Sequence, residues 1–186
     1  MNNFQNVYNT QEYRLSNGTL RYYFVSKGKK DIIKAVQYQY VRHFDGHPLF
    51  NLGFGDFNPA TGTVSDEEIS NNDDPYKVFH TVLNTVPRLF DAYENENVIL
   101  MVQGSDSKPE FIDKCRTSCT RSCGEETCKS AHRRIGIYRR FVDKNFDLLS
   151  ENYIFKGGEG IENQNLIEPY EKGKEYNAVL VMKKNP

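Results

Sequence analysis

The alternation of side-chain types over residues 18–41 constrains the fold more strongly than any other feature. The stretch reads GTLRYYFVSKGKKDIIKAVQYQYV, two extended runs joined by the turn formers Ser26-Lys27-Gly28-Lys29. Successive side chains of a strand point to opposite faces. One face of the second run holds Ile32, Lys34, Val36, Tyr38 and Tyr40, and the other holds Ile33, Ala35, Gln37 and Gln39. The pattern predicts an antiparallel hairpin near the start of the chain.

The rest of the sequence adds strands and helices in an order typical of an α/β protein. Further strands are predicted near Glu12–Leu15 and over PLFNLGFGD (48–56), NVILMVQGS (97–105), NYIFKGG (152–158) and EYNAVLVMKK (175–184). The run at 97–105 is apolar on both faces, which indicates a buried strand. We expect one domain over residues 1–186, with a mixed, mostly antiparallel sheet of six or seven strands.

A helix is predicted to follow the acidic stretch SNNDDPYK. Asp73 or Asp74 suits the N-cap and Pro75 the first helical position. Pro87 interrupts the helical pattern, so we expect a kink near Asn84 or a break into two pieces.

Charge is balanced overall but unevenly placed. The formal net charge of −1 argues against a protein that works mainly by coating nucleic acid or anionic lipid. Residues 57–74 are acidic, rich in turn formers and without a period, which predicts a long loop, either functional or a surface excursion. The N-terminal residues are polar, and no run approaches a membrane span, so we expect a cytoplasmic protein with reduced thiols.

All four cysteines lie in CRTSCTRSCGEETCKSAH, from Cys115 to His132. Ser107 and Glu110 suggest a capping box that starts one helix, and Gly124 suits its end. A second helix is expected from about Glu126. The segment 107–132 would then be a cysteine-rich helical hairpin inserted into the fold.

This hairpin could place four metal ligands together. Cys119 and Cys123 are four residues apart, as are Cys128 and His132, and residues at that spacing stack on one helix face. Four such groups can bind zinc tetrahedrally, with Cys115 as an alternate ligand. All ligands would come from the protein, which predicts a structural rather than a catalytic zinc. Reduced thiols packed in a helix interface, a disulfide and, least favoured, an iron–sulfur cluster remain alternatives.

Two further groups of polar residues are better explained without a site. His43 and His47 flank Asp45, yet no second carboxylate or histidine is tied to them, so a polar hairpin turn is favoured over a metal or acid–base site. His80 is expected to be half-buried in the first helix. The arginines expected on the later helix are Arg133, Arg134, Arg139 and Arg140. A solvated face is favoured for them over a nucleic-acid or other phosphate-bearing partner.

The order of elements resembles the carboxyl-terminal two-thirds of the N-acetyltransferase superfamily. In that comparison Asp73-Asp74-Pro75 opens the helix that holds the pyrophosphate of acetyl-coenzyme A, and RRIGIYRRFVDKNF matches the later helix. The resemblance implies Tyr138 as a general acid. A pyrophosphate site requires exposed backbone amides, usually in a glycine-rich turn. Here two carboxylates and a proline stand in that position, which argues against the cofactor.

The motifs NLGFGD, NNDDPYKVFHTV, VQGS and RRIGIYRRF together resemble a family of small bacterial proteins known only as a domain of unknown function. That family supplies no activity. We therefore favour a non-catalytic interaction or regulatory module that binds another protein. The alternatives are an acyl-coenzyme A-dependent N-acyltransferase that uses Tyr138, and a component of a toxin–antitoxin or phage-conflict system.

Overall fold

The computed structural model places most of the chain in two compact units, Met1–Val98 and Ile99–Pro186. The expectation of a single domain over residues 1–186 stays a prediction. The residues that the structure describes are 6–65, 72–107, 109–118, 123, 128–129, 131–160 and 166–184.

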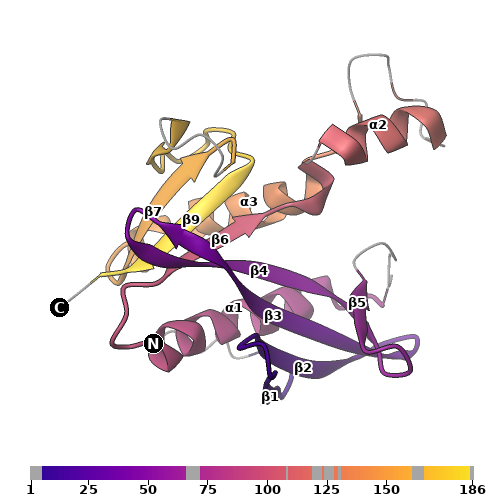
Figure 1. Cartoon of the computed structure of the whole chain (residues 1–186). Coiled ribbons are helices and arrows are strands. Elements are labelled where there is room, and N and C mark those ends of the chain that lie inside the picture. The colour runs from indigo at the N-terminus through magenta and orange to yellow at the C-terminus, as the bar shows by residue number, and fades with distance from the viewer. Residues whose placement is uncertain are drawn as a thin grey trace. The chain divides into compact units, whose positions relative to one another are not determined.

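Within the described residues, the strands of the first unit pair antiparallel in chain order (Figure 1). Its strands are β1 (Gln11–Arg14), β2 (Leu20–Lys27), β3 (Asp31–Phe44), β4 (His47–Asn58) and β5 (Thr63–Ser65). Lys27 lies opposite Asp31, which confirms the predicted hairpin. The loop predicted from residue 57 is wrong in its first part. Phe57 pairs with Val64 because β4 continues to Asn58 and β5 returns along it; residues 66–71 lie outside the described residues.

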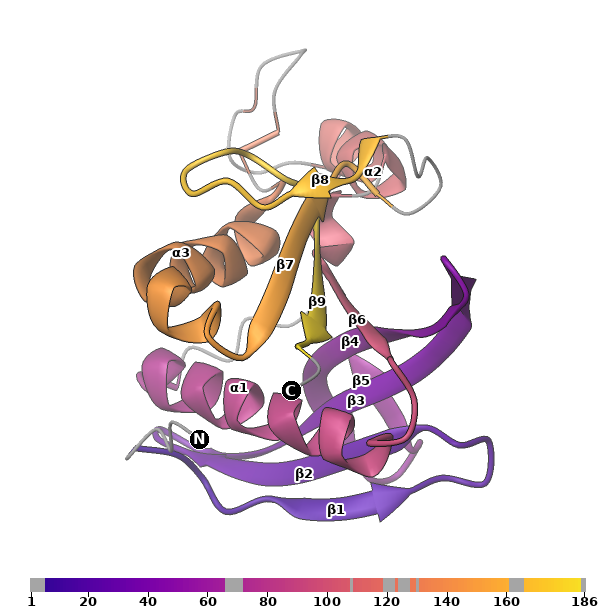
Figure 2. The ribbon, with the colours of Figure 1, turned by 90° about the vertical axis from the view of Figure 1, so that its left-hand side faces the viewer.

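Helix α1 (Pro75–Ala92) packs against β2 and β3, on one face of this sheet (Figure 2). The core beneath it holds Leu20, Tyr22, Phe24, Val36, Tyr38, Leu52, Val78, Val82, Leu89 and Phe90, all buried. A hydrogen bond 2.7 Å long joins the hydroxyls of Tyr38 and Thr85 inside this core. The predicted face of β3 is therefore confirmed by the burial of Val36 and Tyr38.

The start of α1 agrees with the sequence, but its middle does not. Asp74 is the N-cap and Pro75 is the first helical residue, as predicted. The break predicted at Pro87 is wrong, because one helix runs through it. Leu89 and Phe90 are almost completely buried beyond the proline, and their packing outweighs the hydrogen bond that proline removes.

A β-bulge at Val41 changes which side chains of β3 share a face. Tyr40 lies opposite Phe50, but the next paired residue is Arg42. An extra residue reverses the alternation of a strand. Tyr40 and His43 therefore lie on the same face, where the Tyr40 hydroxyl is 2.8 Å from His43 Nδ1.

Within the described residues, the second unit contains four strands that pair antiparallel and two α-helices. The strands are β6 (Ile99–Gln103), β7 (Tyr153–Gly158), β8 (Glu168–Pro169) and β9 (Ala178–Lys183), in the order β6-β9-β7-β8. The described part of the chain thus has nine strands, more than the six or seven predicted. The 3-10 turn η1 spans Ser105–Ser107, and the helices are α2 (Pro109–Ser118) and α3 (Arg133–Leu149). Residues 98–102 are buried, which confirms the predicted buried strand. Helix α3 contacts β6 and places Phe146 against Phe155 of β7.

Candidate functional site

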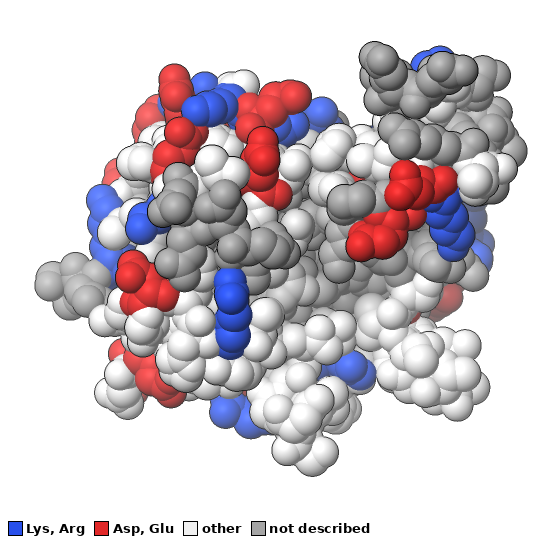
Figure 3. All heavy atoms as spheres, turned by 45° about the horizontal axis from the view of Figure 1, so that its top comes forward, with Lys and Arg blue, Asp and Glu red and all other residues white. Residues whose placement is uncertain are grey.

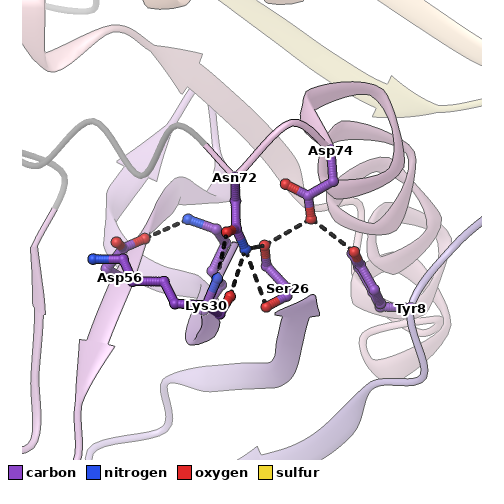
Figure 4. A network of polar contacts seen from close by, with 7 residues as sticks. Tyr8, Ser26, Lys30, Asp56, Asn72 and Asp74 are labelled. Atoms are coloured by element: carbon purple, nitrogen blue, oxygen red, sulfur yellow. Dashed lines mark hydrogen bonds and ion pairs between the residues drawn. The ribbon is translucent and has the colours of Figure 1, made fainter. Parts of the chain in front are cut away.

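The beginning of α1, where the acetyltransferase resemblance places a cofactor, is filled by polar side chains of the first unit (Figure 4). Asp74 Oδ2 accepts hydrogen bonds of 2.7 Å from both the Tyr8 hydroxyl and the Ser26 hydroxyl. Burial, followed by the hydrogen bond to Asp74, raises the pKa of Tyr8 above its usual value. The Asp74 carboxylate is thus directed at two hydroxyl donors of the chain itself.

Asn72 joins this cluster to the turn between β2 and β3. Its Nδ2 donates to Ser26 Oγ (2.8 Å), to the Ser26 carbonyl (3.3 Å) and to the Lys30 carbonyl (2.9 Å). Its Oδ1 accepts from the Lys30 backbone N–H at 3.2 Å. Gly28 lies so close that a Cβ there would be 2.0 Å from the Asn72 carbonyl oxygen. The turn between β2 and β3 therefore packs so closely against the residues before α1 that position 28 requires glycine.

A buried ion pair lies on the same side of the sheet. The Lys34 ammonium contacts the Asp56 carboxylate, with the two side chains 5% and 21% exposed. Lys34 is therefore one of the few buried charges in the described part of the chain, and burial of this kind requires a partner. Asn72, Ser26 and Asp56 were not identified from the sequence.

The cysteine segment in the second unit brings three thiols together. The Sγ atoms of Cys115, Cys123 and Cys128 all lie within 4.8 Å of one another, close enough to hold a metal ion. The Sγ atoms of Cys115 and Cys128 are 2.8 Å apart. The Lys129 backbone N–H donates to Cys123 Sγ at 3.2 Å, which stabilises negative charge on that sulfur.

The predicted ligand set agrees with this cluster only in part. Cys123 and Cys128 are in it, and Cys115, the alternate ligand, is the third member. Cys119 and Gly124 lie outside the described residues. His132 is described but is not a member of the group.

The helical spacing from which the ligands were paired is wrong for the described residues. Helix α2 ends at Ser118, before Cys123. Helix α3 begins at Arg133, after Cys128, and not near residue 126. His132 is the residue before α3 and is left-handed, with φ of 58°. Cys115 therefore lies on α2, whereas Cys123 and Cys128 lie outside the helices, so the three thiols do not meet through the stacking of residues four apart.

Asp106 in η1 fixes the connection between the cysteine segment and α3. Its Oδ2 accepts from the Arg134 backbone N–H (3.0 Å), and its carbonyl accepts from the His132 N–H (3.2 Å). Asp106 is 3% exposed and places a carboxylate at the start of α3, where the helix dipole favours it. The predicted capping box is wrong, because the Ser107 hydroxyl has no partner among the described residues. Asp106, the buried acid after β6, instead caps α3, a role that the sequence pattern did not predict.

Tyr138 lies in α3. Burial raises the pKa of its hydroxyl to about 12, and Arg134 opposes part of the increase. A general acid works best with a pKa near the operating pH. Tyr138 would be a weak acid in this environment.

The charged side chains on the face in Figure 3 do not favour a broad nucleic-acid surface there. On the face in Figure 3, basic and acidic side chains are intermingled over the part of the chain that the structure describes. Sequence-independent nucleic-acid binding requires clustered basic groups. Within the described residues, no helix is both long and apolar enough to cross a membrane.

Comparison with known proteins assigns the chain to a group without naming an activity. One family model matches residues 6–110, more than half of the chain, and its description is a family of unknown function (DUF6934). No curated protein and no solved structure matches the chain. The match ends before Cys115, so it covers the cluster around Asn72 but not the cysteine segment.

Proposed function

The chain belongs to this family of unknown function, and we propose that it is a non-catalytic interaction or regulatory module whose cysteine segment binds a structural zinc ion. The observation that supports the metal is the grouping of three thiol sulfurs within 4.8 Å. Thiolates are preferred ligands of zinc, and a reduced cluster of this kind is typical of a structural site.

The separations of the sulfurs suit zinc after a small adjustment. With Zn–S bonds of about 2.3 Å, tetrahedral geometry sets neighbouring sulfurs roughly 3.8 Å apart. The Cys115 and Cys128 sulfurs, now 2.8 Å apart, would separate by about 1 Å on binding. The fourth ligand in this proposal is Cys119, with His132 as the alternative. A fully protein-ligated ion would support folding rather than catalysis.

The non-catalytic assignment is supported by the start of α1. An acyl-coenzyme A-dependent transferase would need backbone amides open to a pyrophosphate there. The position instead holds the Asp74 carboxylate, which accepts two hydroxyl hydrogen bonds, and Pro75, which lacks an N–H. A pyrophosphate would have to displace these bonds and approach a negative charge. A protein partner is the better match.

The N-acetyltransferase-like arrangement and the inserted character of residues 107–132 belong to the same proposal. The order of strands and helices supports the first. The end of the family match at residue 110 supports the second. Neither requires that the coenzyme be bound.

The zinc proposal is tested by elemental analysis of the purified full-length chain. We expect about one zinc per chain, and loss of that zinc in Cys123→Ser. Thr117→Ser, an exposed change in the same segment, is the matched control and should keep the metal. Cys119→Ser tests the fourth ligand and should weaken zinc retention. A metal-free wild-type chain with four titratable thiols would contradict the proposal.

The non-catalytic assignment is tested separately by calorimetry with acetyl-coenzyme A. We expect no heat of binding. Micromolar binding that is weakened by a substitution at the start of α1 would establish the acyltransferase alternative instead. Binding of this kind would leave the zinc result unaffected, so the two parts of the proposal can fail independently.

A further inference from the structure

A small polar cavity in the second unit has no role in the zinc proposal. Its volume is about 240 Å³, and it lies between α3 and the loop that precedes β9. The lining residues are Gly136, Arg139, Arg140, Asp143, Gly173, Lys174 and Glu175. Three cationic side chains thus border one cavity, together with two carboxylates.

Arg139 is the residue that makes this cavity unusual, because its charge is largely buried and poorly paired. Its side chain is 15% exposed, and within the described residues its ion pair is a 3.5 Å contact with Glu175, which is 92% exposed. Its Nε is buried without a hydrogen-bond partner among the described residues. A guanidinium offers five N–H donors, and a buried charge requires compensation. A solvent-exposed carboxylate at 3.5 Å supplies little of it.

Gly136 keeps space open beside this guanidinium. It lies in the interior of α3, where glycine is unfavourable relative to alanine. A Cβ at this position would be 3.9 Å from Arg139 Nη2 and 4.0 Å from Arg140 Nη1. A methyl group would therefore fit in van der Waals contact with both guanidinium groups and would take up part of the cavity that they border. The glycine is explained if another group needs that volume.

The two carboxylates that line the cavity supply little compensation for the buried charge of Arg139. Asp143 Oδ1 is already engaged, since it accepts from the Tyr170 hydroxyl at 2.9 Å and from the Gly173 N–H at 3.3 Å. These bonds hold the loop against α3. Lys174 pairs with Glu168, and both side chains are about half exposed. Among the described residues, Glu175 is the acid that forms an ion pair with Arg139, and solvent can replace it readily.

We propose that this cavity binds a phosphate-type oxyanion through Arg139 and Arg140, with Lys174 as an auxiliary cation. Arginine forks match the oxygens of a phosphate group and can bind them bidentately. The cavity is at the small end of ligand sites, which suits a phosphate or a small phosphomonoester. The bound oxyanion would displace Glu175 and satisfy the buried guanidinium. The site uses none of the cysteines and is independent of the zinc.

Titration of the full-length chain with inorganic phosphate, followed by calorimetry, tests the proposal. We expect a dissociation constant on the order of 1 mM or tighter. Arg139→Gln should weaken binding at least about tenfold, as expected when a charge-assisted pair is lost. Arg133→Gln, an exposed change on the same helix outside the cavity, is the matched control and should leave affinity unchanged.

Two further variants separate binding from folding. Gly136→Ala should weaken phosphate binding yet raise the melting temperature, because alanine favours the helix while its methyl group fills the cavity. Glu175→Gln should strengthen binding several-fold, because it removes the competing carboxylate. Loss of phosphate binding in Glu175→Gln, or unchanged binding in both Gly136→Ala and Arg139→Gln, would overturn the proposal.

A second ligand distinguishes a small free phosphate from the phosphate backbone of a nucleic acid. A single-stranded oligonucleotide without a terminal phosphate should bind no more tightly than inorganic phosphate. The oligonucleotide could instead bind more tightly than phosphate, and Arg133→Gln could weaken its binding as much as Arg139→Gln does. That result would indicate an extended nucleic-acid-binding surface along α3 and would refute a small-anion site.

Discussion

Substitution of Asn72 tests whether the cluster at the start of α1 holds the first unit together. Asn72→Ala removes the Nδ2 group, which donates hydrogen bonds to the Ser26 hydroxyl, the Ser26 carbonyl and the Lys30 carbonyl. The bond from the Lys30 N–H to Oδ1 is lost as well. Ser26 is fully buried, so its groups cannot recover these bonds from water.

The expected cost follows from the number of bonds that the amide can make at once. Two donated bonds and one accepted bond, at about 1 kcal/mol each, give a loss of about 3 kcal/mol. Asn72→Asp should cost more than Asn72→Ala, although its shape is conserved. An aspartate oxygen would face the carbonyl oxygens of Ser26 and Lys30, and its charge would add to Asp73 and Asp74 nearby.

Urea unfolding followed by far-ultraviolet circular dichroism measures both variants. A loss of about 3 kcal/mol should lower the transition midpoint by roughly 1–3 M, since m-values of small proteins are about 1–3 kcal/mol/M. Asn58→Ala is the matched control. Asn58 is exposed and accepts one hydrogen bond, from the Ala60 N–H at 2.9 Å, so its loss should cost less than about 1 kcal/mol.

The order of the variants is the decisive result. The reasoning is refuted if Asn72→Asp is as stable as the wild type, or if Asn72→Ala behaves like Asn58→Ala. Hydrogen exchange at the Lys30 amide provides a local measure, and it should accelerate in both Asn72 variants.

Three other substitutions probe separate features. Thr85→Val removes the buried bond to the Tyr38 hydroxyl and should cost about 1–2 kcal/mol in urea unfolding, so an unchanged midpoint would contradict the role of that bond. Gly157→Ala should cost about 1–3 kcal/mol, because its Cβ would lie 2.5 Å from the Tyr176 ring. Burial raises the pKa of Tyr138 from 10.0 to about 12, so the stability that it contributes is complete below pH 10 and is lost as pH rises toward 12. Tyr138→Phe should make this part of the alkaline stability profile flatter, and an identical profile would refute the assignment.

Local rules predicted the parts of the fold that depend on neighbours in sequence. The alternation in β3 identified Val36 and Tyr38 as core residues, and the Asp74-Pro75 pair located the start of α1 within one residue. Both depend on the geometry of a single strand or helix turn. The break predicted at Pro87 was wrong because the packing of Leu89 and Phe90 determines whether the helix continues. The local sequence pattern contains no information about that packing.

The candidate sites depended on contacts that no spacing rule contains. Asn72 binds Lys30 across 42 residues, and nothing in NNDDP distinguishes that asparagine from its neighbour. The cysteines were identified by composition, but their pairing assumed helices where the described backbone is not helical. Arg139 and Arg140 were recognised only as members of a charged helix, because the cavity that they border is completed by residues 173–175, in the loop before β9.

The close fit between Gly28 and the Asn72 carbonyl has a practical consequence for labelling this chain. Hairpin turns are normally the positions at which a polypeptide accepts an inserted tag, provided that their backbone is exposed and makes few contacts. The turn after β2 fails that condition, because even one added carbon at Gly28 would lie 2.0 Å from another backbone oxygen. The turn at 59–62 meets it, since its residues are exposed and a Cβ at Gly62 has no atom within 4 Å. Affinity handles and fluorophores therefore belong between β4 and β5, where they need not unfold the unit that carries them.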